Sequence, residues 1–81
     1  MSGAGDRARA LLAGALEMAP DALGADASIA TLEAWDSLAH LRLVEALERA
    51  VGRPLEPEAI VAIGSLADVI AILEAARNTR R

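Results

Sequence analysis

The stretch of sequence that decides the fold covers residues 36–52 and reads DSLAHLRLVEALERAVG. Its aliphatic side chains recur at three- and four-residue steps, as on one face of an α-helix; they are Leu38, Leu41, Val44, Leu47 and Val51. Asp36 or Ser37 is a suitable N-cap, and Gly52 suits the left-handed position that often follows a helix. We therefore predict a helix here, with the aliphatic set buried and a wet face formed by Arg42, Glu45, Glu48 and Arg49.

The sequence on either side predicts three further helices. The first covers residues 6–18, with Asp6 as its cap, Pro20 as its stop and an apolar stripe of Ala8, Leu11, Leu12, Ala15 and Leu16. A short helix runs from Pro57 to about residue 62, with Ile60 and Ile63 pointing inward. The last begins after Ser65, with Asp68 in a capping-box position, and buries Leu66, Val69, Ile70, Leu73 and Ala76.

Residues 19–35 lack a sustained period and predict a long ordered loop, since a connection of this length in a small domain is usually functional. Leu23, Ile29 and Leu32 are its expected anchors. We predict an all-α fold: a small four-helix bundle of three main helices and one short helix, with a long first loop. Residues 1–81 would form one domain, with a core over about 6–76 and an Arg-rich tail over 77–81.

Composition excludes several classes of protein. The 81 residues are 54% apolar, yet they contain one Trp and neither Phe nor Tyr, which suits closely packed small helices. The absence of Cys excludes disulfides and thiolate chemistry, and a single His excludes a multi-histidine metal site. The net charge of -4 argues against nucleic acid and for a basic protein partner. No apolar run reaches the roughly 20 residues that a membrane span needs. The absence of Cys favours a cytosolic protein, and an acidic surface without an obvious exposed apolar stripe favours a monomer.

The segment richest in possible chemistry is Trp35-Asp36-Ser37-Leu38, where the long loop meets the central helix. Free backbone N–H groups and the positive end of the helix dipole suit a bound or attached phosphate beside the Ser37 hydroxyl. Asp36 could orient a metal or a transferase during modification. The simpler interpretation is that Asp and Ser are only N-caps, as they commonly are.

At this point the sequence resembles the acyl carrier proteins, the phosphopantetheine-binding domains of fatty-acid and polyketide synthesis. The motif of that family, Asp-Ser-Leu, stands here as Asp36-Ser37-Leu38, and aliphatic residues follow at Leu41, Val44 and Leu47. The resemblance extends over about residues 6–76 through Asp26-Ala27-Ser28-Ile29, Leu32, Gly52-Arg53-Pro54-Leu55 and Ile63-Gly64-Ser65-Leu66-Ala67-Asp68-Val69.

The resemblance implies a carrier that is not itself an enzyme. A phosphopantetheinyl transferase would move the 4'-phosphopantetheine arm of coenzyme A onto Ser37, with Trp35, Asp36 and Leu38 around it. Acyl-loading and acyl-processing enzymes would then dock on the second helix, and a cavity between helices two and four would shelter the acyl chain. The expected docking residues are His40, Leu41, Arg42, Val44, Glu45 and Glu48, with Ala39 and Leu43 beside them.

Two departures from the family pattern point to a specialised pathway. Glu33-Ala34-Trp35 stands where the family commonly has a glycine, and Arg42 stands where many members carry a negative charge. Charge at the rim of an interface mainly sets partner choice and encounter rate. We therefore expect a dedicated carrier with its own partner enzymes. A peptidyl carrier is the nearest alternative, although such carriers usually place glycines before the serine and lack this Asp-Ser-Leu.

Other interpretations of the same residues remain open. The chain is alternatively an unmodified acidic interaction module in which Ser37 only caps a helix, or a small hydrolase that pairs Ser37 with His40. In the carrier interpretation His40 is a solvated or partner-facing side chain. Trp35 covers one end of the core, contacts the arm, or does both.

Overall fold

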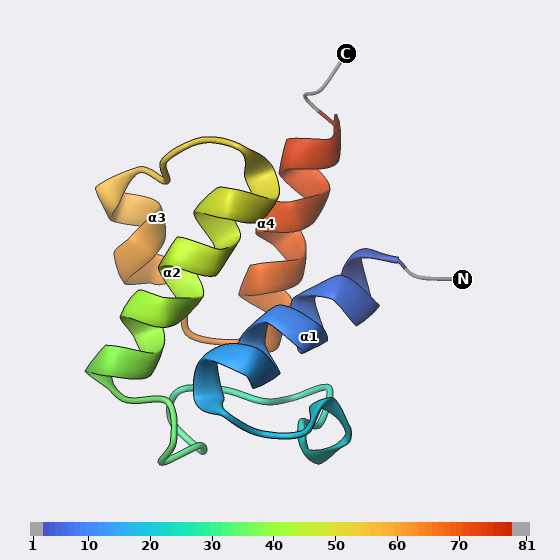
Figure 1. The fold of residues 1–81 in the computed structure, drawn as a ribbon, viewed down its shortest axis with the longest axis vertical. Coiled ribbons are helices and arrows are strands. Elements are labelled where there is room, and N and C mark those ends of the chain that lie inside the picture. Colours follow the sequence, from blue (N-terminus) through green and yellow to red (C-terminus); the bar gives the residue numbers. More distant parts are fainter. Residues whose placement is uncertain (1–2, 79–81) are drawn as a thin grey trace.

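The structure, a computed structural model, describes residues 3–78. Three long helices, α1 (Ala4–Leu16), α2 (Ser37–Val51) and α4 (Leu66–Asn78), are joined by a single 3-10 turn, η1 (Pro20–Ala22), and a short helix, α3 (Pro57–Ala62) (Figure 1). No strand occurs between residues 3 and 78. The predicted all-α class, with three main helices, one short helix and a long first loop, is confirmed. The tail prediction falls largely on residues 79–81, outside the described residues.

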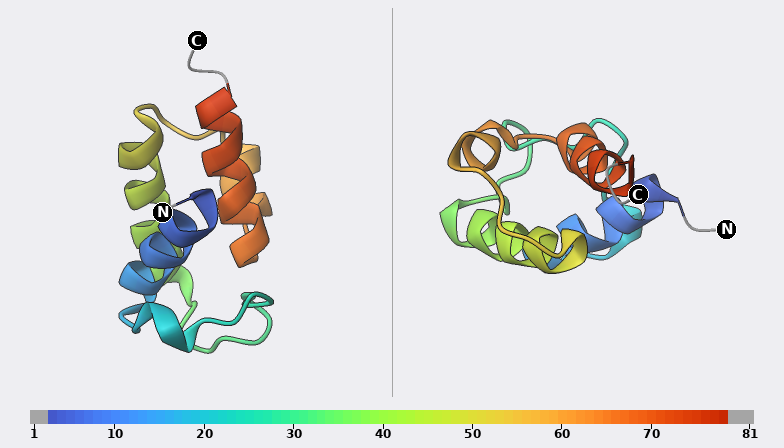
Figure 2. Two further views of the ribbon diagram at one scale, coloured as in Figure 1. Left: turned by 90° about the vertical axis from the view of Figure 1, so that its right-hand side faces the viewer. Right: turned by 90° about the horizontal axis from the view of Figure 1, so that it is seen from above.

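The core lies where α1, α2 and α4 meet. Its largest fully buried side chains are Leu12, Leu43, Leu47, Leu66 and Val69. Helix α3 lies on the opposite side of the molecule from α1 (Figure 2), and none of its six residues is buried. Its inward anchor is Ile63, which follows it and is 3% exposed. Helix α3 is therefore held to the bundle more weakly than the three long helices.

Helix α2 begins and ends where the sequence predicts, but its buried face is different. Asp36 is its N-cap, and Gly52 follows it in the left-handed region with φ 80°. The side chains that face the core are Ala39, Leu43, Val44 and Leu47, while Leu38 and Leu41 are 56% and 60% exposed. The predicted burial of Leu38 and Leu41 is wrong, because apolar residues occupy both sides of the first two turns and packing against α1 selects the other side.

Helix α1 starts earlier and ends differently than predicted. It begins at Ala4 after Gly3, so Asp6 lies in the first turn and is not the cap. It ends at Glu17, which has φ 58° and donates its backbone N–H to Gly14 O at 3.3 Å. Pro20 does not stop the helix, because the turn at Glu17 has already ended it; Pro20 instead opens η1.

The long loop is fixed as much by backbone hydrogen bonds as by side chains. Ile29 N–H donates to Gly64 O at 2.8 Å, and Leu66 N–H donates to Ala27 O at 3.0 Å, on either side of an isolated antiparallel bridge between residues 28 and 65. Leu23 is buried as predicted and Leu32 is half-buried, but Ile29 is 48% exposed. Ile29 is therefore wrong as a core anchor.

The cap of α4 is the predicted capping box, except that Asp68 binds the N–H of Gly64 and not that of Ser65. Asp68 N–H donates to Ser65 Oγ at 3.1 Å, and Asp68 Oδ2 accepts from Gly64 N–H at 2.8 Å, one residue before the expected position. Of the predicted stripe, Leu66, Val69, Leu73 and Ala76 are buried, and Ile70 packs at its edge.

Candidate functional site

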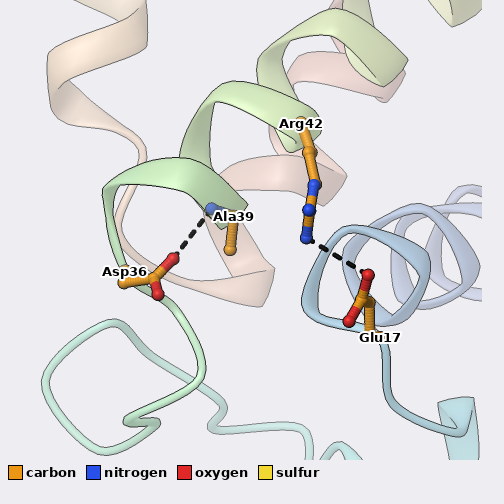
Figure 3. A network of polar contacts seen from close by, with 4 residues as sticks. All are labelled: Glu17, Asp36, Ala39 and Arg42. Atoms are coloured by element: carbon orange, nitrogen blue, oxygen red, sulfur yellow. Dashed lines mark hydrogen bonds and ion pairs between the residues drawn. The ribbon is translucent and has the colours of Figure 1, made fainter.

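Ser37 is the first residue of α2, and its hydroxyl is not the helix cap. Asp36 Oδ1 accepts the backbone N–H of Ala39 at 2.9 Å and so occupies the cap position (Figure 3). Ser37 is exposed, and its hydroxyl has no hydrogen-bond partner within residues 3–78. The interpretation of Ser37 as only a cap is therefore wrong, because its neighbour performs that role.

An open groove of about 660 Å³ lies directly beside Ser37. The loop, α2 and the α3 segment line it, through Ile29, Trp35, Asp36, Ser37, His40, Leu41, Val61 and Ile63. The predicted cavity between helices two and four is not at this place: the groove takes its walls from α2 and α3. A hollow that α2 and α4 share with Arg7 holds about 50 Å³ and lies at the far end of α2.

A chain of hydrogen bonds forms one wall of the groove. The Trp35 indole Nε1–H donates to His40 Nδ1 at 3.0 Å, and His40 Nε2 lies 2.9 Å from the Ile60 carbonyl oxygen. The two rings also stack, with centroids 6.2 Å apart and planes inclined by 26°. Because an indole N–H can only donate, Nδ1 of His40 accepts, and Nε2 carries the proton that is donated to Ile60.

These bonds correct two predictions about His40. The side chain is half-buried with both ring nitrogens engaged, so it is neither solvated nor free to face a partner. For the same reason it has no nitrogen left to accept a proton from Ser37, although the two residues lie three positions apart on α2. The hydrolase hypothesis loses its general base. Trp35, 3% exposed, covers the core as predicted and also lines the groove, while its contact with the arm stays a prediction.

Most of the chain matches a known protein family. Residues 6–73 match the family described as phosphopantetheine attachment site. The chain belongs to this family. No match was found among the curated proteins. Members of the family carry a covalently attached 4'-phosphopantetheine group and interact with enzymes as carrier domains.

The N-terminal end of α2 suits the phosphate of such a group. The backbone N–H groups of Ser37 and Leu38 have no partner within residues 3–78, so they are free to face an attached anion. The helix dipole favours negative charge at the same place. The negative charge of the Asp36 carboxylate would repel such an anion, but this carboxylate is already held by the hydrogen bond from Ala39 N–H. The described part of this carrier domain holds no cluster of three or more metal-ligating side chains.

The predicted docking residues of the carrier domain, apart from His40, differ in exposure. Leu41 and Glu45 are exposed, and so is Arg42, which pairs with Glu17 across to α1 at 3.3 Å (Figure 3). Leu38, expected beside the phosphopantetheine arm, is exposed too. Val44 is 6% exposed and belongs to the core, as do Ala39 and Leu43, so none of these three is available to a partner. Glu48 is half-buried and accepts the N–H of Leu55 at 2.9 Å.

Two exposed apolar side chains that line the groove were not predicted from the sequence as part of the site. Val61 of α3 is 84% exposed and Ile29 of the loop is 48% exposed, and both face the groove with Leu41. Val61 lies one residue after the half-buried Ile60 and two before the buried Ile63, so its outward position follows from helical spacing once α3 is placed. In the described part of the chain no helix is long and apolar enough to span a membrane.

Proposed function

We propose that this chain is an acyl carrier protein whose attachment residue is Ser37. The observation that supports this assignment is the exposed, unpartnered hydroxyl of Ser37 at the first position of α2, with the cap already supplied by Asp36. Phosphopantetheine supplies a thiol at the end of a flexible arm, on which acyl groups are held as thioesters. The chain itself supplies the attachment oxygen and the surroundings of the arm, and is not an enzyme.

Attachment requires one substitution at phosphorus. The Ser37 Oγ forms a bond to the phosphorus that bears the pantetheine arm in coenzyme A, and adenosine 3',5'-bisphosphate leaves with the electrons of the broken P–O bond. The hydroxyl proton passes to a base of the transferase. Asp36, adjacent and held by Ala39 N–H, is positioned to present a carboxylate to the transferase and its divalent cation.

The surface around Ser37 carries exposed apolar and charged side chains that partner enzymes could contact in turn. Leu38, Leu41 and Val61 are exposed on the two helices that flank the groove, where a partner can bury them. Arg42 and Glu45 lie on the same side of α2 and would set which enzymes dock. Because Arg42 carries a positive charge, which pairs with Glu17 at 3.3 Å, this rim is not uniformly acidic. We infer a dedicated carrier of a specialised fatty-acid or polyketide pathway, acting as one domain over residues 1–81 with its core at about 6–76.

The deciding experiment is intact mass after incubation with coenzyme A, magnesium and a broad-specificity phosphopantetheinyl transferase. We expect a gain of one phosphopantetheine group on the wild type and none on Ser37→Ala. A folded chain that several transferases leave unmodified would favour the unmodified interaction module. If the arm attaches but only aminoacyl-loading enzymes charge it, the peptidyl carrier alternative replaces the acyl carrier.

A further inference from the structure

The hydrogen-bonded chain through Trp35, His40 and Ile60, here called the His40 bridge, joins three segments that are separate in the backbone. Trp35 ends the long loop, His40 lies in the first turn of α2, and Ile60 belongs to α3. Ser37 lies between the first two, and the groove beside it is lined by Trp35, His40 and the neighbour of Ile60, Val61. The bridge therefore spans the walls of the attachment site.

We propose that His40 is a positioning residue for Ser37: its neutral ring holds α3 and the end of the loop against the attachment site, and its protonation releases them. Only the link to Ser37 chemistry rests on the proposed function above. The bridge itself concerns the unmodified protein and can be tested in its absence.

Helix α3 depends on the bridge because little else holds it. None of its six residues is buried, so packing fixes it weakly. The carbonyl of Ile60 lies in the last turn of a short helix, where carbonyl groups lack helical partners, and the His40 Nε2–H satisfies it. At the other end, the 3% exposed Trp35 would leave a buried indole N–H unpaired without Nδ1.

The bridge works in one protonation state only. The neutral ring accepts at Nδ1 and donates at Nε2, but a doubly protonated ring has two donors, and Nδ1–H would then oppose the indole N–H. The bridge is therefore intact while the ring is neutral and is lost when the ring takes up a second proton.

Carboxylates stand on or beside the segments that the bridge joins. Asp36 lines the same groove, but its Oδ1 is bonded to Ala39 N–H. Glu33 of the loop and Glu56 and Glu58 beside or on α3 are exposed. Asp68 of α4 accepts from Gly64 N–H. No hydrogen bond or ion pair joins any of these carboxylates to the His40 ring, so the bridge is the interaction that its protonation changes.

The first test uses the unmodified wild-type chain and nuclear magnetic resonance. We expect the His40 ring as the Nε2–H tautomer at mildly basic pH, and a Trp35 indole N–H that exchanges slowly with solvent. As the pH is lowered, the protection factors of the amide protons of Ile60 and Ile63, in and after α3, should fall before those of α1 and α4 do; a protection factor corrects each observed rate for the slower intrinsic exchange at lower pH. An Nδ1–H tautomer, or an α3 whose exchange follows the rest of the bundle at every pH, would overturn the proposal.

The second test uses His40→Phe, which removes both hydrogen bonds of the bridge, and Trp35→Phe, which removes only the indole bond; both keep a ring. His40→Phe should speed α3 amide exchange about tenfold or more and Trp35→Phe by less, since a single hydrogen bond contributes about 1 kcal/mol, while protection in the long helices remains. The matched control is Leu12→Val in the core of α1, which should lower protection evenly. If either bridge variant fails to fold, the wild-type pH series still decides.

The transferase reaction tests the link to Ser37. We expect both bridge variants to raise the KM for modification more than they lower kcat, and Leu12→Val to change neither. The wild-type reaction should show the same rise in KM as pH falls, and His40→Phe should not. Bridge variants with wild-type kinetics would refute the positioning role. Failure of the wild type to be modified at all would refute the attachment proposal instead, while the exchange data still decide the bridge.

Discussion

The carboxylate of Asp36 accepts the backbone N–H of Ala39 at 2.9 Å, and this bond separates two roles that the sequence leaves merged. Asp36 stabilises the start of α2, and Ser37 is left with a free hydroxyl in solvent. Neighbouring residues of similar capping propensity thus divide the structural and the chemical task between them.

Substitution of Asp36 should lower stability, whereas substitution of Ser37 should abolish modification. Asp36→Ala is expected to lower the free energy of unfolding by about 1 kcal/mol, because an orphan N–H loses its acceptor. Asp36→Asn, which keeps an acceptor, should lose much less. Ser37→Ala should change stability by less than about 0.5 kcal/mol while abolishing modification. Urea unfolding measures the first effect and intact mass the second. A larger loss for Ser37→Ala than for Asp36→Ala would contradict the assignment of the cap.

The exposed and buried leucines of α2 should respond differently to truncation. Leu43→Ala removes a fully buried side chain and should cost about 2–5 kcal/mol, a large fraction of the stability of a small domain. Leu41→Ala, at a 60% exposed position, should leave the unfolding free energy within about 0.5 kcal/mol and yet weaken binding to the transferase. Thermal unfolding and transferase KM separate these effects. Equal destabilisation by both would mean that Leu41 packs in the core after all.

Glu17 provides a test of backbone strain at the end of α1. It has φ 58°, which a residue with a Cβ adopts at a cost, and its exposed ion pair with Arg42 contributes little. Both Glu17→Gly and Glu17→Ala remove the ion pair, so their difference isolates the backbone. Glycine should be the more stable of the two by about 1 kcal/mol in urea unfolding. An alanine variant as stable as the glycine variant would show that φ is not positive at this position.

The cap of α4 should also control the long loop. Asp68→Ala removes the acceptor for Gly64 N–H, and the Gly64 carbonyl in turn accepts from Ile29. We expect a loss of about 1 kcal/mol and faster amide exchange at Ile29. Asp68→Asn keeps an acceptor and is the matched control. The prediction fails if the loop amide stays as protected as in the wild type while α4 is destabilised.

Much of the fold could be predicted because its signals are local. Ser65 and Asp68 mark the start of α4, Gly52 marks the end of α2, and Pro57 opens α3. Each of these depends on residues within one helical turn. The helix end at Glu17 could not be predicted, since nothing in its side chain favours the left-handed conformation.

The buried face of α2 could not be read from the sequence for a different reason. Apolar residues stand at 38, 39, 41, 43 and 44, so two faces of the helix satisfy the same periodicity, and only contact with α1 and α4 decides between them. The role of His40 was equally hidden. Its partners lie 5 and 20 residues away, and the pairing depends on where α3 is placed.

The two backbone bonds that tie residues 27 and 29 to residues 66 and 64 set the order in which the molecule can assemble. They close a long loop that contains α2 and α3 entirely, and closing such a loop is a slow, entropically costly step. During synthesis the segment with Ser37 leaves the ribosome before Gly64 and Leu66 do. We therefore expect the groove to be completed late, so that a transferase that requires it would discriminate finished chains from nascent ones.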